Sequence, residues 1–207
     1  VYKLSSLTAV LDGPNELVRE GANANEILIP KMSMQGLADY NKNTGYVAGD
    51  VTLDYETKKC AYDRGRMFNV DAMDNIESAG IAFGRLSGEF LRTQVVPELD
   101  AYRLAAYAQI AGVTTVKGVL ANGKEALAAL RAARGKIENA EANLATCYLF
   151  INPTVYGMIE DLDTTASKKA IEGFAGIVKV PSGRFYSKVK LNASGAGGFA
   201  KDTGGVA

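Results

Sequence analysis

Gly118 to Glu125 is the part of this 207-residue chain that comes nearest to a nucleotide-binding motif. Its sequence, GVLANGKE, matches the phosphate-binding loop G-x-x-x-x-G-K-[S/T] at every fixed position except the last. That last position normally carries a Ser or Thr hydroxyl, which coordinates the magnesium ion of the nucleotide. Glu125 stands there instead and would place a carboxylate beside the phosphate groups. We therefore interpret the segment as a loop that leads into the first turn of a helix.

Two other groups of residues have side chains or spacing that could serve a ligand. Gly195 to Ala200 (GAGGFA) fits the loose dinucleotide fingerprint, which requires a helix directly after it. A polar stretch with further glycines follows instead, so a flexible loop is favoured. Glu160, Asp161 and Asp163 could bind a cation weakly, but a solvated acidic patch at a helix end is the preferred interpretation.

The chain contains no histidine, and this absence restricts its chemistry more than any motif does. Ser-His-Asp and Cys-His nucleophile systems and all His-ligated metal sites are excluded. The two cysteines, Cys60 and Cys147, lie far apart in apolar surroundings, which favours free thiols in a reducing compartment. We therefore predict no catalytic, cofactor-binding or metal-binding residues and expect that the protein is not an enzyme. A small enzyme that uses carboxylates and lysines is the alternative from a different class.

Length and composition are those of a globular protein with one sizeable domain or two small lobes. Apolar residues make up 47% of the sequence, and 23 basic residues balance 23 acidic ones. This balance gives no indication of strong nonspecific binding to nucleic acid or to a membrane surface. No apolar run approaches the roughly 18 residues that cross a bilayer, and no signal-peptide pattern is visible. The chain begins at Val1 and ends in a glycine-rich segment, so we expect its C-terminal part to be incomplete.

The N-terminal third carries strand signals that are separated by polar stretches. Asn15 to Glu26 is polar and has the composition of an arm. Ile27 to Met34 is predicted to be a strand at a sheet edge, because its proline cannot donate a ladder hydrogen bond. Val51 to Glu56 alternates between apolar and polar residues, which is typical of a half-exposed strand. Thr57 to Lys59 can form a turn, after which Cys60 to Val70 would return antiparallel. Such a hairpin is marginal in water by itself and needs a surface to lie on.

A very long helix is predicted after Asp74, which can form a capping box with Glu77. Ile81 to Ala111 contains no strong helix breaker except Pro97, and at 1.5 Å per residue this stretch would be roughly 45 Å long. Pro97 removes the hydrogen bond to the carbonyl of Thr93 and should kink the helix. A strand inside this stretch would contradict the predicted fold.

The remainder of the chain is predicted to alternate between helices and strands. Lys124 to Leu144 has the apolar spacing of an amphipathic helix, with Arg134 and Glu138 as a surface i,i+4 pair. Cys147 to Ile151 is a strand by length and composition, and Asn152-Pro153 then starts a short helix. Two more strands and a glycine-rich segment that is not expected to be ordered alone complete the chain: Ile177 to Val180, Phe185 to Leu191 and Asn192 to Ala207.

The order of these elements resembles the Hong Kong 97-type fold of the major capsid proteins of tailed bacteriophages, which encapsulin nanocompartments share. Four pieces are most like that family and are spread over nearly the whole chain: GLADYNKNTGYVAGDVTLDYET, DRGRMFNVDAMDN, VVPELDAYRLAAYA and LFINPTVYGMI. The resemblance implies an α+β chain with an N-terminal arm at residues 1–26 and an extended β-hairpin loop at residues 27–70. A peripheral domain with a spine helix would follow at residues 71–112. An axial domain with the glycine-rich C-terminal segment would occupy residues 113–207.

The same resemblance implies a structural function. The chain would assemble with copies of itself, as hexamers and pentamers, into an icosahedral phage head around double-stranded DNA. The packaged DNA would be contacted weakly and nonspecifically; a scaffolding protein and a portal are the other implied partners, and no membrane is involved. Assembly would take place in the cytoplasm of the bacterial host, and the final location would be the virion capsid. An encapsulin-type shell around protein cargo is the alternative within the same fold.

Apolar and aromatic residues of the extended loop are the predicted assembly contacts. Leu37 to Asp50 is polar and rich in Gly and Asn, so it has little apolar surface to bury within its own subunit. Its tyrosines could bind a small ligand, but contacts to a neighbouring subunit explain them better, because aromatic side chains often supply much of the binding energy there. The predicted contact residues are Leu37, Tyr40, Tyr46, Tyr55 and Tyr62.

Overall fold

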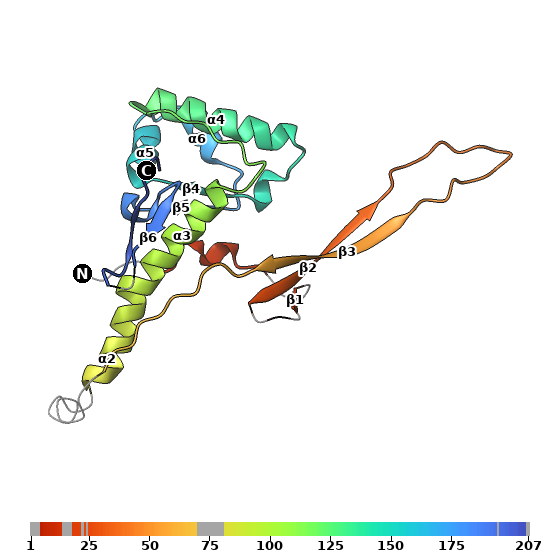
Figure 1. Cartoon of the computed structure of the whole chain (residues 1–207). Coiled ribbons are helices and arrows are strands. Elements are labelled where there is room, and N and C mark those ends of the chain that lie inside the picture. Colours follow the sequence, from red (N-terminus) through yellow and green to blue (C-terminus); the bar gives the residue numbers. More distant parts are fainter. Residues whose placement is uncertain are drawn as a thin grey trace. The chain divides into compact units, whose positions relative to one another are not determined.

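The computed structural model of the chain describes residues 5–13, 18–21, 23, 25–69, 81–193 and 195–205. Its elements are a mixture of helices and small sheets, which confirms the predicted α+β class (Figure 1). The chain divides into two compact units, one of Val1–Val10 with Ala72–Ala207 and one of Leu11–Asp71. The finer division into arm, extended loop, peripheral domain and axial domain stays a prediction.

The smaller unit contains a three-stranded antiparallel sheet in the order β1-β2-β3. β1 (Arg19–Glu20) pairs only with the start of β2 (Glu26–Met34), whereas β2 and β3 (Val51–Lys59) pair along their full length. Beyond β1 the sheet is therefore a two-stranded ribbon, which we call the β2–β3 ribbon, and residues 35–50 join its strands. The predicted strand that ends at Met34 is confirmed.

The predicted turn at Thr57 to Lys59 is wrong, because these residues continue strand β3. The ladder runs to its end at Lys59, which pairs with Glu26, so the hairpin forms between β2 and β3. No strand is described in residues 60–69, and the predicted return strand Cys60 to Val70 is therefore also wrong over its described part. The lysines suggested a turn by their charge, but on an exposed ribbon a charged side chain is as compatible with a strand as with a loop.

One long helical stretch belongs to the larger unit and confirms the predicted helix over its described part. It consists of α2 (Ile81–Phe90), a π-helical turn (Leu91–Val95) and α3 (Val96–Ala108). The predicted cap at Asp74 lies outside the described residues. The π-helical turn stands directly before Pro97, whose missing N–H disturbs the regular hydrogen-bond pattern. Figure 1 shows α2 and α3 as one continuous rod, and a widened turn stands where a kink was predicted.

The main core of the larger unit lies between helices and a parallel strand pair. β4 (Tyr148–Ile151) and β5 (Gly176–Lys179) are parallel, and α5 (Pro153–Glu160) and α6 (Thr165–Ile171) form the crossover that such a pair requires. With α4 (Gly123–Asn139), these helices lie on one side of the strands (Figure 1). The buried core residues are Ala126, Leu127, Leu130, Ile151, Ile159 and Ala170.

Local sequence signals in this region are confirmed. The Asn152 side chain accepts a hydrogen bond from the Thr154 amide at 2.9 Å and caps α5, with Pro153 at its first turn. Arg134 and Glu138 form the expected ion pair, with 2.7 Å between Nε and Oε1. Arg134 also donates to two backbone carbonyls at the end of α6, so this surface pair fixes one helix against another.

The C-terminal glycine-rich segment has more structure than predicted. β6 (Val189–Leu191) pairs antiparallel with β7 (Phe199–Lys201), so the predicted flexible loop after Asn192 contains the turn and second strand of a hairpin. Gly197 and Gly198 have positive φ angles of 65° and 66°, which residues with side chains rarely adopt. The glycines therefore shape a turn, and a strand follows them where a dinucleotide fold would have a helix.

A buried carboxylate on α3 joins three distant parts of the larger unit. Asp100 is fully buried and accepts hydrogen bonds from the Ser6 hydroxyl (2.9 Å), the Leu7 amide (3.0 Å) and the Thr8 hydroxyl (2.8 Å). From the other side, the guanidinium of Arg184, also buried, donates to Asp100 at 3.0 Å. The carboxylate thus holds the N-terminal segment and the turn before β6 against the same point of the long helix.

The hydrogen bonds keep this carboxylate charged inside the protein. Burial is the largest single influence on the pKa of Asp100 and acts to raise it. The hydrogen bonds from Leu7, Thr8 and Ser6 together outweigh burial, so the pKa lies below its ordinary value. A buried charge is tolerated only when it is paired and hydrogen-bonded, and Asp100 has both kinds of partner.

Replacing Asp100 by Asn should destabilise the protein strongly, because the buried Arg184 would lose its ion pair with Asp100. We expect a loss of about 3 kcal/mol in the free energy of unfolding, measured by urea denaturation. Glu138→Gln is the matched control, because it removes the anionic partner of Arg134 at an exposed site and should cost less than about 1 kcal/mol. Equal losses in the two variants would contradict the anchoring role of Asp100.

The same carboxylate should make the protein sensitive to acid. Its folded pKa lies below the unfolded value of about 3.9, so its contribution is present above that pH and is lost as the pH falls through the folded pKa. Urea denaturation between about pH 5 and pH 2.5 should therefore show a steeper loss of stability in the natural protein than in Asp100→Asn. Parallel curves for the two proteins would contradict this assignment.

Candidate functional site

The pairing register sorts the side chains of the β2–β3 ribbon onto two different faces. Residues directly opposite each other in an antiparallel pair share a face. From Pro30 onward one face is apolar, with the pairs Pro30–Tyr55, Met32–Leu53 and Met34–Val51, and we call these three pairs the apolar ribbon face. The other face is mostly polar, with the pairs Lys31–Asp54 and Ser33–Thr52. The ribbon is therefore amphipathic, although it has only two strands over most of its length.

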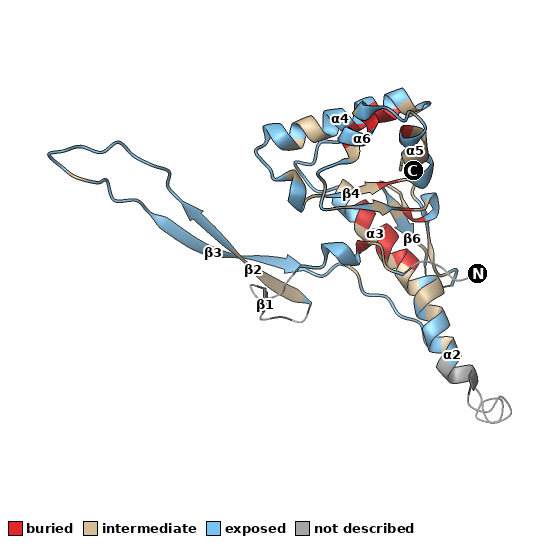
Figure 2. Cartoon of the chain, turned by 180° about the vertical axis from the view of Figure 1, so that it is seen from behind, coloured by how far each residue is buried: buried red, intermediate tan, exposed pale blue. Residues whose placement is uncertain are grey.

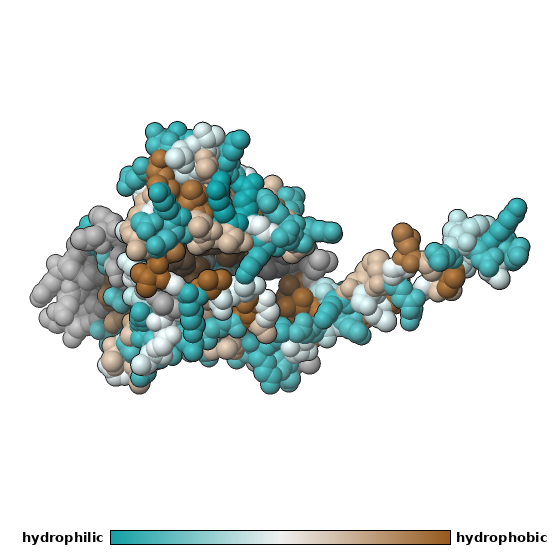
Figure 3. Space-filling view, turned by 90° about the horizontal axis from the view of Figure 1, so that it is seen from above, coloured by the Kyte–Doolittle hydropathy of each residue, from teal (hydrophilic) through white to brown (hydrophobic). Residues whose placement is uncertain are grey.

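The apolar ribbon face is open to solvent (Figure 2). Met34 is 68% exposed, Met32 and Val51 are each 61% exposed, and Leu53 is 54% exposed. Hydrophobic residues are accordingly visible along the ribbon in the space-filling view (Figure 3). A single two-stranded layer cannot cover its own face, so this exposed apolar surface is a candidate interaction site.

The loop at the end of the ribbon carries a preformed aromatic tip. Asn41 and Gly45 form an isolated β-bridge, and the Asn41 side chain accepts a hydrogen bond from the Asn43 amide at 2.9 Å. Gly45 has a φ angle of +77°, which suits glycine at this turn. The bridge brings the rings of Tyr40 and Tyr46 together, with 5.0 Å between their centroids. The turn itself thus fixes the shape of the tip. The two rings are tilted against each other, an arrangement that aromatic pairs favour.

The structure places the five predicted contact residues on the smaller unit and exposes most of them. Leu37 and Tyr46 are almost entirely exposed, and Tyr40 is 61% exposed. Tyr55 belongs to the apolar ribbon face and has the guanidinium of Arg19 over its ring. Tyr62 is only half-buried and lies in the segment after β3, apart from the tip pair. The structure therefore brings together Tyr40 and Tyr46 and puts Tyr55 on the ribbon.

Sequence reasoning missed the methionines of β2, Met32 and Met34, which are both more than half exposed. Met32 and Met34 alternate with Lys31 and Ser33, and this alternation is a signal for an amphipathic strand. The alternation alone does not identify a site. The pairing of β2 with β3 shows that the apolar residues of both strands share one face.

The near match to a phosphate-binding loop has a different role in the structure. Asn122 caps α4 by accepting a hydrogen bond from the Glu125 amide at 3.0 Å. The Glu125 carboxylate in turn accepts from the Ala121 amide at 2.9 Å and from the Asn122 side chain at 3.1 Å. A carboxylate therefore already occupies the N-terminal turn of this helix, where phosphate groups would have to bind.

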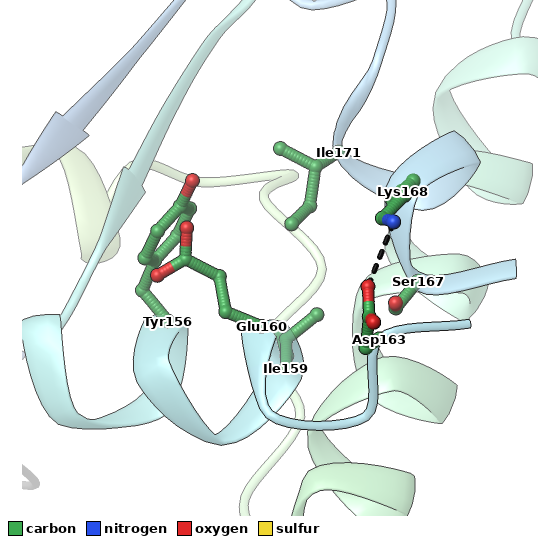
Figure 4. A pocket seen from close by; sticks show the side chains of 7 residues that line it. All are labelled: Tyr156, Ile159, Glu160, Asp163, Ser167, Lys168 and Ile171. Carbon is green, nitrogen blue, oxygen red and sulfur yellow. Dashed lines mark ion pairs between the residues drawn. The ribbon is translucent and has the colours of Figure 1, made fainter. Parts of the chain in front are cut away.

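Glu160 and Asp163, but not Asp161, line a shallow pocket of about 410 Å³ at the end of α5 (Figure 4). Asp163 forms an ion pair with Lys168 at 2.7 Å, and a hydrogen bond to the Glu160 carboxylate, more than burial, raises the pKa of Tyr156. Both carboxylates are thus engaged with neighbours that line the same pocket. In the described part of the chain, no three Cys, Asp or Glu residues come together in a way that could hold a metal ion.

Comparisons with protein-family models, with curated proteins and with solved structures found no match for this chain. Among the described residues, no helix combines the length and the apolarity that crossing a membrane requires. The apolar ribbon face and the aromatic tip are therefore the features on which a functional proposal can rest.

Polar substitutions on the apolar ribbon face should leave the stability of the isolated subunit unchanged. Met32→Thr combined with Leu53→Thr keeps residues with good strand propensity and removes side chains that bury little surface. We expect a change in the free energy of unfolding within about 0.5 kcal/mol. Ile159→Ala, at a fully buried site, is the control and should cost about 3 kcal/mol. A loss of that size in the ribbon variant would show that the subunit itself covers this face.

Proposed function

We propose that this chain is a structural subunit that assembles with copies of itself into a closed shell, the icosahedral head of a tailed bacteriophage around double-stranded DNA. The observation that carries the proposal is the amphipathic β2–β3 ribbon, whose apolar face and aromatic tip are exposed. The order of elements that resembles the major capsid fold gives this surface its interpretation as an intersubunit contact.

The energetics of the ribbon support a partner that covers it. A two-stranded hairpin is marginal in water, because its backbone hydrogen bonds and single layer do not offset the loss of chain entropy. Burying the apolar ribbon face against another surface would add the missing hydrophobic stabilisation. The ribbon therefore gains order in the same step in which it binds, which suits an element that lies on a neighbouring subunit.

The size of the ribbon favours many repeated contacts over one dimer contact. Each strand has nine residues, so one face of the ribbon is about 30 Å long and covers roughly 300 Å². A stable interface needs about 800 Å² from each partner. A subunit that donates its ribbon to one neighbour and receives the ribbon of another would bury more. Such head-to-tail contacts close into rings when the rotation allows it, as hexamers and pentamers do.

The remaining features of the proposal follow from the charge balance of the chain and from its resemblance to the major capsid fold. The sequence has 23 basic and 23 acidic residues, so packaged DNA would be held weakly and without sequence preference. A scaffolding protein and a portal would be additional partners, and assembly would take place in the bacterial cytoplasm before the chain becomes part of the virion.

Replacing residues 37–50 by a short Gly-Ser linker in the full-length protein should abolish shell formation and leave the subunit folded. The loop contributes exposed side chains, so its loss removes contacts to the neighbour without opening the core. Particle counts by electron microscopy and thermal melting followed by circular dichroism measure the two effects separately. Lys42→Ser, which changes the same turn and keeps both tyrosines, is the matched control and should still form shells.

Normal particles from the linker variant would overturn the assigned role of the loop, and so would global unfolding of that variant. A natural protein that stays monomeric at all concentrations would overturn the proposed function as a whole. Particles filled with protein cargo in place of DNA would identify an encapsulin-type shell.

A further inference from the structure

The segment between α3 and α4 is extended, exposed and rich in β-branched residues. Thr114 to Leu120 reads TTVKGVL, and Val116 and Val119 are 82% and 88% exposed. The backbone groups of these residues make no hydrogen bond to any other described residue. Such a segment has the composition of a strand but has no strand partner among the described residues of its own chain.

The β2–β3 ribbon also has backbone groups without a strand partner, along the free edge of β3. β3 pairs with β2 along one edge, and no described strand lies along its other edge, which therefore presents unpaired backbone donors and acceptors. Among the charged residues of β3, Glu56 pairs with Lys58 and Lys59 pairs with Glu26. Asp54 makes no ion pair with a described residue.

We propose that Thr114 to Leu120 of one copy adds to the free edge of β3 of a neighbouring copy as an antiparallel strand, with Lys117 opposite Asp54. Strand addition satisfies the unpaired backbone groups on both sides, and the alternate side chains fix the register. This inference rests on the proposed assembly and names the surface of the neighbour that receives the ribbon.

The register set by Lys117 and Asp54 agrees with the two faces of the ribbon except at Val119, which lies opposite Thr52 on the polar face. With Lys117 opposite Asp54, Val116 lies opposite Tyr55 and Leu120 lies opposite Val51, so both extend the apolar ribbon face. Gly118, which has no side chain, lies opposite Leu53. Lys117 falls on the polar face, where it places a second cation beside Asp54, on the side of β3 away from Lys31. It is the only charged residue in the segment, so no repulsion opposes this register.

A second copy of β3 is disfavoured at the same edge in the register centred on Tyr55. Two β3 strands that pair antiparallel around Tyr55 would place Asp54 opposite Glu56 on both sides of the centre. Like charges directly opposite each other destabilise a strand pair. The sequence of β3 thus disfavours this symmetric pairing, while Lys117 favours the segment after α3.

The test is a charge exchange in the full chain, followed by hydrogen exchange on the assembled particles. Lys117→Glu should raise the subunit concentration needed for assembly several-fold, because it places like charges opposite each other, and Asp54→Lys should do the same. The double variant Lys117→Glu with Asp54→Lys should return this concentration to within about twofold of the natural protein. Lys136→Glu, the same charge change on the exposed surface of α4, is the control and should have no effect.

Hydrogen exchange separates this inference from the proposed function. On assembly, the amides of residues 114–120 should become at least tenfold slower to exchange, and in the linker variant of residues 37–50, which stays unassembled, they should remain fast. Particles in which these amides stay fast, or a double variant as defective as the single ones, would overturn the inference and leave the shell proposal intact. A natural protein that never assembles would overturn both.

Discussion

The larger unit depends on one buried carboxylate, because Asp100 is the point at which three separate stretches of chain meet. Ser6 to Thr8 arrive from the N-terminal end, Arg184 arrives from the turn before β6, and the carboxylate itself belongs to the long helix. Each partner is required, since a buried charge that loses a partner costs several kcal/mol. The interaction therefore fixes the N-terminal stretch and the turn before β6 at the same point of α3.

The ribbon of the smaller unit contrasts with this buried interaction. It has a well-defined register but no buried cluster, and the apolar residues of one face are more than half exposed at Met32, Met34, Val51 and Leu53. A slip of one residue would turn the apolar side chains of one strand to the polar face, so the register matters only if something recognises the apolar face. In the proposed shell that recognition comes from a neighbouring subunit. The ribbon is then specified by its own pairing and stabilised by assembly.

The sequence predicted those parts of the structure that depend on local signals. Asn152 before Pro153 marked the start of α5, Arg134 and Glu138 lay one helical turn apart, and the composition around Pro97 allowed only a helix. Features that depend on distant residues were not predictable in this way. Asp100 and Arg184 are 84 residues apart, and nothing close to either of them signals a buried pair. The short strand β7 was missed for a related reason, since its pairing with β6 outweighs the flexibility of the glycines between them.

For the candidate site, the sequence predicted which types of residue take part but not how they are arranged. Tyr40 and Tyr46 stood out among polar neighbours, but their contact depends on the bridge between Asn41 and Gly45. The apolar ribbon face depends on which residues of β2 and β3 lie opposite each other, and the charged end of β3 concealed its true length.

The proposed shell would use individually weak contacts for a physical reason. A ribbon face of roughly 300 Å² is too small for a lasting dimer, so a wrongly placed subunit can leave before the next contacts form. A correctly placed subunit makes several contacts at once, and their combined strength greatly exceeds that of one contact. The balanced charge of the chain fits the same arrangement. A strongly basic wall would hold DNA through the release of many counterions and slow its movement during packaging, whereas a neutral wall leaves the association of the subunits to surfaces such as the ribbon.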